Sequence, residues 1–63
     1  MPREPATWST RDRVVYHRRD AAYFRHMAEA ATCSAARDLL VDLARRYRQL
    51  ASSLEKEVRA AAA

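Results

Sequence analysis

The chain has 63 residues, 49% hydrophobic and 32% charged, so its size limits it to one small domain and its composition favours folding over disorder. It contains no Gly and only two Pro, which excludes glycine-rich phosphate loops and the usual tight β-hairpin turns. The single Cys excludes an internal disulfide, and this Cys with two His does not complete a four-ligand zinc site.

The charge is basic but evenly distributed along the sequence. Twelve Lys and Arg against eight Asp and Glu give a net charge of +4, and each half of the chain holds six basic and four acidic residues. The heavy use of Ala and Arg is typical of a GC-rich bacterial genome. No apolar run is long enough to span a membrane or to serve as the core of a signal peptide. With its lone thiol, we expect a cytoplasmic bacterial protein that has no membrane partner.

The first predicted element is an extended arm over residues 1–8, because Pro2 and Pro5 disfavour helical backbone in the residues before them. A helix is predicted over 9–31, with Ser9 or Thr7 as its N-cap; Asp12, three residues after Ser9, would form a capping box with Ser9. Residues at alternating spacings of three and four mark its packed face: Val14, His17, Ala21, Phe24, Ala28 and Ala31.

A turn is predicted over 32–34, with Thr32 as the N-cap of a second helix over 35–59. The packed face of that helix is expected to consist of Ala36, Leu40, Leu43, Tyr47, Leu50 and Leu54. Folding the chain back at the turn pairs the two faces as Ala28 with Ala36, Phe24 with Leu40, Ala21 with Leu43, His17 with Tyr47 and Val14 with Leu50. The predicted fold class is therefore all-α, an antiparallel helical hairpin.

A second stripe on the first helix remains uncovered by this pairing. It consists of Tyr16, Tyr23, Met27 and Ala30, about 120° around the helix from the packed face. A hairpin of this size also has too little core to be stable alone. We therefore expect a homodimer joined through this stripe as a four-helix bundle. The sequence leaves open whether pairing uses the first helix or both helices.

The spacing of apolar residues over about residues 22–55 resembles that of small bacterial α-hairpin proteins of unassigned function. The resemblance is carried by Phe24, Arg25, Met27 and Ala28, followed by Leu39, Leu40, Leu43, Ala44, Tyr47, Leu50 and Ala51. It departs from the family pattern at Cys33, where the turn usually has Pro. The resemblance implies a helical hairpin and attaches no activity to it.

The residues able to carry chemistry do not form a catalytic constellation. His17 and His26 are nine residues apart and point to opposite sides of the helix, so no metal site is expected, and no cofactor is expected either. His17 facing Tyr47 predicts a pH-sensitive pair in the core, because burial disfavours a charged imidazole. Cys33 at a helix start is either a chance occupant of the turn or a reactive thiol able to form an intermolecular disulfide under oxidation. No nucleophile has an adjacent base, so we expect no enzymatic activity.

One basic cluster stands out in the second helix, formed by Arg37, Arg45, Arg46 and Arg48. It is interpreted as a solvated charged face or as a contact patch for phosphates. The expected function is a non-enzymatic structural or protein–protein interaction module whose partner is itself or another protein. The alternative is a small basic nucleic-acid-binding or regulatory protein, which the even distribution of charge along the sequence does not favour.

Overall fold

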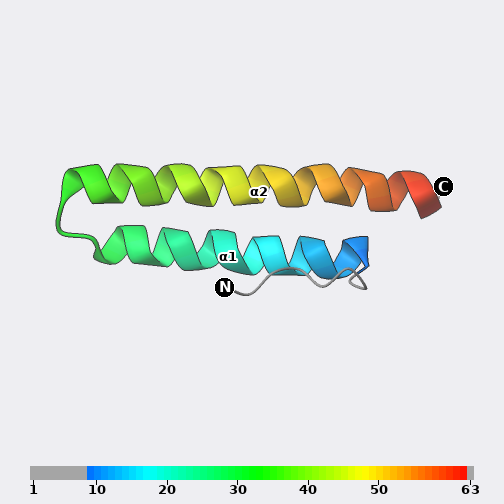
Figure 1. Ribbon diagram of the computed structural model, residues 1–63, viewed down its shortest axis with the longest axis horizontal. Coiled ribbons are helices and arrows are strands. Elements are labelled where there is room, and N and C mark those ends of the chain that lie inside the picture. The colour runs from blue at the N-terminus through cyan, green and yellow to red at the C-terminus, as the bar shows by residue number, and fades with distance from the viewer. Residues whose placement is uncertain (1–8, 63) are drawn as a thin grey trace.

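The protein is a pair of α-helices folded back on one another, as seen in a computed structural model that describes residues 9–62 (Figure 1). Helix α1 spans Thr10–Ala30 and helix α2 spans Ser34–Ala62. They contain 21 and 29 residues, together 50 of the 63, and the described part of the chain contains no strand. The all-α hairpin is confirmed, whereas the arm predicted over 1–8 lies outside the described residues.

Helix α1 begins with the predicted capping box. The Asp12 backbone N–H donates to Ser9 Oγ at 3.1 Å, and the Ser9 backbone N–H donates to Asp12 Oδ2 at 3.3 Å. These two bonds satisfy donors that the first turn of a helix leaves without intrahelical partners. The helix ends where Ala31 adopts an extended conformation, with φ −70° and ψ 135°.

The turn comprises residues 31–33, one residue earlier than expected. Helix α2 starts at Ser34, so Cys33 occupies the N-cap position immediately before it. The prediction that Thr32 is the N-cap is wrong. The Arg37 backbone N–H donates to the Cys33 carbonyl at 3.0 Å, while Arg37 Nη2 donates to the Ala31 carbonyl at 3.1 Å. Helix α2 continues to Ala62, beyond the predicted end at 59, because Ala has the highest helix propensity.

The interface between α1 and α2, here called the seam, uses the α1 face that the sequence predicts. Val14, His17, Ala21 and Ala28 are buried, and Phe24 and Ala31 are half-buried. On α2 the residues toward the seam lie four positions after the predicted set. They comprise the buried residues Ala44 and Ala51 and the half-buried residues Leu40, Tyr47, Leu54 and Val58. Of the other predicted members, Leu43 is also half-buried, whereas Ala36 and Leu50 are exposed.

The aromatic contacts fix how the helices are aligned. The Tyr47 ring centroid lies 5.8 Å from that of His17 and 5.4 Å from that of Phe24. Tyr47 therefore lies between them, at the level of Ala21, whereas the sequence pairs Ala21 with Leu43. The alignment has moved by four residues, about one helical turn. The same alignment sets Phe24 opposite Ala44 and His17 opposite Ala51, so a large side chain meets an alanine at these three levels.

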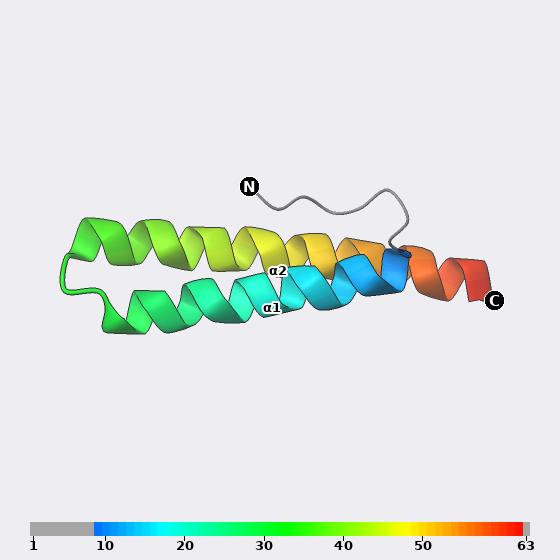
Figure 2. The same ribbon diagram turned by 60° about the horizontal axis from the view of Figure 1, so that its bottom comes forward.

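The hairpin is elongated and only one layer thick (Figure 2). Its radius of gyration is 13.6 Å, compared with about 10.6 Å expected for a compact domain of this length. The buried hydrophobic residues are Val14 and four alanines, and no large side chain in the described part is fully buried. Neither described helix has the length and apolar character needed to cross a membrane.

We expect Ala51→Leu to destabilise the protein, because Ala51 is fully buried in the seam and a larger side chain forces the helices apart. The expected loss is about 1–3 kcal/mol of unfolding free energy, measured by urea denaturation at fixed protein concentration. The control is Ala60→Leu, which makes the same change at an exposed position and should alter stability by less than about 0.5 kcal/mol. Equal losses in the two variants would contradict the packing of the seam.

Candidate functional site

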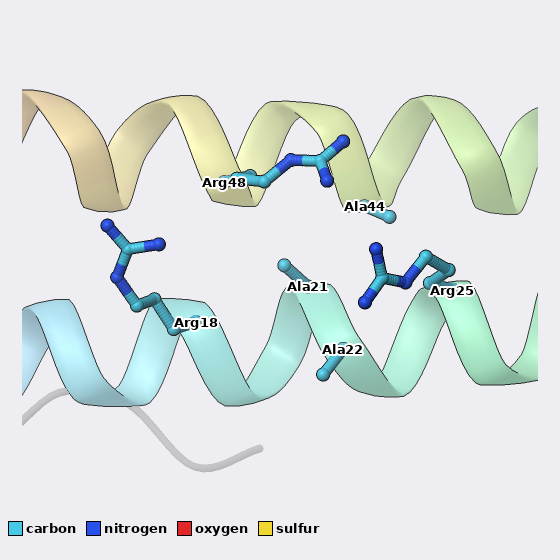
Figure 3. Close-up of a pocket in the computed structure, with 6 residues that line it drawn as sticks. All are labelled: Arg18, Ala21, Ala22, Arg25, Ala44 and Arg48. Atoms are coloured by element: carbon cyan, nitrogen blue, oxygen red, sulfur yellow. The ribbon is translucent and has the colours of Figure 1, made fainter.

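Arginines from both helices line a hollow along one side of the seam. Arg18 and Arg25 reach from α1 toward α2 on either side of Ala21, and Arg48 lies along α2 opposite them (Figure 3). The hollow has a volume of about 150 Å³, and its remaining lining consists of Ala21, Ala22 and Ala44. No carboxylate lines it. The hollow is thus a small cavity with an apolar floor and a cationic rim.

An ion pair between the helices lies next to this hollow. Arg18 Nη2 donates to Glu55 Oε1, joining residues 37 positions apart in the sequence. Beyond Glu55 a second hollow of about 300 Å³ follows on the same side, lined by Arg11, Val14, Val15, Glu55, Val58 and Arg59. The two hollows share one side of the hairpin, which we call the basic flank: Arg11, Arg18 and Arg25 of α1 with Arg48, Glu55 and Arg59 of α2.

The opposite side of the seam carries large apolar side chains. Successive residues advance about 100° around a helix, so Tyr16, Tyr23 and Met27 lie on the side of α1 away from Arg18 and Arg25. By the same geometry, Leu39 and Leu50 lie on the side of α2 away from Arg48. Because the arginine sides of both helices line one hollow, these five residues share the other side, here called the apolar flank.

The apolar flank is exposed in the single hairpin. Tyr23 is 60% exposed, Leu39 61% and Leu50 48%. The predicted interface residues Tyr16, Tyr23 and Met27 belong to this flank, and Ala30 is exposed near its edge. Sequence reasoning missed Leu39 and assigned Leu50 to the core. The available signal was that the leucines at positions 39 and 50 are followed by Leu40 and Ala51, which lie in the seam while the two leucines before them are exposed.

The predicted basic patch is divided between different sides of the hairpin. Arg46 lies about 200° around α2 from Arg48 and pairs with Asp42 at 2.9 Å. Arg37 shares the side of Arg48, but its side chain is bound to the turn. Arg45 points to solvent between these directions. Of the four predicted residues, Arg48 alone lines a hollow, together with two arginines of α1.

The predicted pair of His17 and Tyr47 is in contact. His17 is 9% exposed, and its ring is tilted by 31° from that of Tyr47, while Tyr16 meets His17 edge-on at 6.0 Å. Tyr47 stacks on Phe24 at the same level of the seam. The contact is established, and the response of this pair to pH stays a prediction.

Potential ligands and nucleophiles lie far apart. No group of three or more His, Cys, Asp or Glu within residues 9–62 is placed to hold a metal ion. Cys33 is a free, exposed thiol at the turn, and His17 is 13 residues from the end of α1, about 20 Å along the helix. Hydrogen bonds from the backbone N–H groups of Ala36 and Ala35 lower the pKa of the Cys33 thiol.

Comparisons with protein-family models, with curated proteins and with solved structures find no match to this chain. The resemblance of residues 22–55 to small bacterial α-hairpin proteins therefore stays an expectation. What the protein does must be inferred from its own two flanks.

We expect the Cys33 thiol to ionise at lower pH in the folded protein than in the unfolded chain, because helix N–H groups stabilise the thiolate. The measurement is the rate of alkylation by iodoacetamide against pH, in buffer and in urea. A depressed folded pKa also means that the thiolate stabilises the fold at alkaline pH, and that this gain disappears as pH falls through the folded pKa. Cys33→Ser is the unreactive control. Identical pH midpoints of alkylation in buffer and in urea would contradict the stabilisation of the thiolate by the helix N–H groups.

Proposed function

We propose that this protein is a non-enzymatic protein–protein interaction module that acts as a homodimer, in which two hairpins form an antiparallel four-helix bundle. The observation that supports it is the apolar flank, where Tyr23, Leu39 and Leu50 are each about half exposed or more in the single chain. Soluble proteins rarely expose a contiguous apolar surface of this kind without a partner.

The small core of a single hairpin favours a second copy of the chain as that partner. Four of the five buried hydrophobic residues are alanines, and two helices side by side form only one layer. Domains of this size generally gain the missing stability from disulfides, metals or association. The single Cys33 is a free thiol, which leaves association as the route open to this chain.

The composition of the flank also suits self-pairing. Both helices contribute to it, so the proposed dimer pairs through α1 and α2 together, with the same surface on each copy as a two-fold contact requires. Tyrosine rings bury apolar area while their hydroxyls reach the rim of an interface. At the edge, Arg46 is neutralised by Asp42, so like charges need not approach across the two-fold axis. A cytoplasmic location, suited to a reduced exposed thiol, is part of the proposal.

We expect the wild type to have about twice the 7.2 kDa chain mass in light scattering and a melting temperature that rises with protein concentration. Tyr23→Asp with Met27→Asp should abolish the dimer and most of the helix signal, since unpaired carboxylates in a dimer core cost several kcal/mol, roughly the stability of so small a fold.

The matched control is Val15→Asp with Val41→Asp, which replaces exposed valines that lie outside the apolar flank. This variant should remain dimeric and helical. A wild type that is a helical monomer at micromolar concentration would refute the proposal, as would a flank variant that dimerises like the control. Stable association with a different protein in place of self-association would also refute it.

A further inference from the structure

Folding concentrates the charge of the chain on one side, although the sequence distributes it evenly. The basic flank comprises five arginines and one glutamate, a formal charge of +4, which equals the net charge of the whole chain. The rest of the protein is therefore electrically balanced. A single-sign surface on a small protein attracts ligands of the opposite sign and accelerates their association.

The hollow at Arg18, Arg25 and Arg48 is large enough for one functional group of a ligand but too small for a whole small molecule. Its volume of about 150 Å³ is below the roughly 300–1,000 Å³ of small-molecule pockets. The floor is made of alanine methyl groups, so polar recognition falls to the three guanidinium groups around the rim.

Two of these guanidinium groups have no carboxylate partner within the described chain. Arg18 is held by Glu55, whereas neither Arg25 nor Arg48 forms an ion pair with any residue of 9–62. Glu29 follows Arg25 by one turn on α1 but does not line the hollow. Planar guanidinium groups bind phosphate oxygens through paired hydrogen bonds, and they are the preferred residues for that role.

We propose that the basic flank binds the phosphodiester backbone of a nucleic acid, with one phosphate seated between Arg18, Arg25 and Arg48. The second hollow favours a chain of phosphates as the ligand rather than a single free anion. Arg11, Arg18 and Arg25 recur at seven-residue intervals, about 10.5 Å apart along α1, and Arg59 joins Arg11 at the far hollow. A polyanion engages both hollows at once, which a single phosphate does not.

The proposed contacts reach phosphates and no base edge, so binding should be independent of base sequence. This inference does not depend on the proposed dimer, because the hollow lies within one chain and on the flank opposite the apolar one. Failure of either proposal leaves the other standing.

The test is fluorescence anisotropy of labelled single-stranded and duplex oligonucleotides of mixed sequence, titrated at several salt concentrations. Wild type should bind at low salt, with an affinity that falls on a log–log plot with a slope of about −1.4 to −1.8, as expected for two neutralised phosphates, one at each hollow. Arg25→Gln with Arg48→Gln should reduce that slope by about 0.7–0.9, as expected for the loss of one phosphate contact, and weaken binding roughly tenfold or more at low salt.

The matched control is Arg19→Gln with Arg46→Gln, which removes the same charge from positions outside the basic flank. It should retain the wild-type slope and most of the affinity. Circular dichroism of both variants checks that the helices persist. Arg18 is left unchanged, because its ion pair with Glu55 joins the helices and its loss would confuse folding with binding.

Several outcomes would overturn the proposal. No binding at low salt is the first, and equal weakening in both Arg variants is the second, because binding would then follow net charge alone. Stabilisation by inorganic phosphate, measured against chloride at equal ionic strength, without oligonucleotide binding would indicate a single-anion site. Binding of polyglutamate as strong as that of the oligonucleotide would indicate an acidic protein as the ligand.

Discussion

The packing of alanine against a large side chain at three successive levels of the seam determines the rest of this structure. Tyr47 lies over Ala21, and the same alignment sets Phe24 against Ala44 and His17 against Ala51. Small residues let two helices approach closely while large ones fill the space that is left. Alanines occupy much of the seam, while Leu39 and Leu50 beside it remain exposed. A seam of this kind orders two helices but buries little apolar area.

The narrow seam gives the hairpin two surfaces of different chemistry. On one side, arginines from both helices meet around alanine floors, and Glu55 neutralises one of them. On the other side, Tyr23, Leu39 and Leu50 remain exposed, and the nearby Arg46 is paired within its own helix. Each surface combines residues from both helices, so neither exists until the hairpin forms. Function in such a small protein therefore depends directly on folding.

The helices, the capping box and the packed face of α1 were predictable, because each is set by local spacing and short-range hydrogen bonds. The alignment of the helices was not, since moving α2 by four residues preserves the alternating three–four pattern. Leu43 followed by Ala44, and Leu50 followed by Ala51, offer two faces of similar hydrophobicity. Size decides between them, because Phe24 and His17 need small partners. The apolar spacing alone favours the larger residue in each pair, which is why Leu50 is predicted in the core but is exposed in the structure.

The basic flank was hidden for a different reason. Its arginines come from both halves of the chain, and each half carries the same balance of charge. Arg45, Arg46 and Arg48 are close in sequence, yet a helix separates Arg46 from Arg48 by more than half a turn. A seven-residue interval joins Arg11, Arg18 and Arg25, and an eleven-residue interval joins Arg37, Arg48 and Arg59. Both intervals nearly complete whole turns, so this spacing was the signal in the sequence for a shared side.

The two proposed surfaces constrain one another. A two-fold contact through the apolar flank covers Tyr23 and Leu50 on both copies, and it leaves the two basic flanks facing away from each other. A single stretch of nucleic-acid backbone then reaches one basic flank only. The basic flank of the other copy is free for another segment of the same nucleic acid or for another nucleic-acid molecule. Two weak sites on opposite sides of a rigid bundle gain affinity only when both segments are held near each other. A dimer built in this way would bridge two stretches of nucleic acid rather than grip one of them.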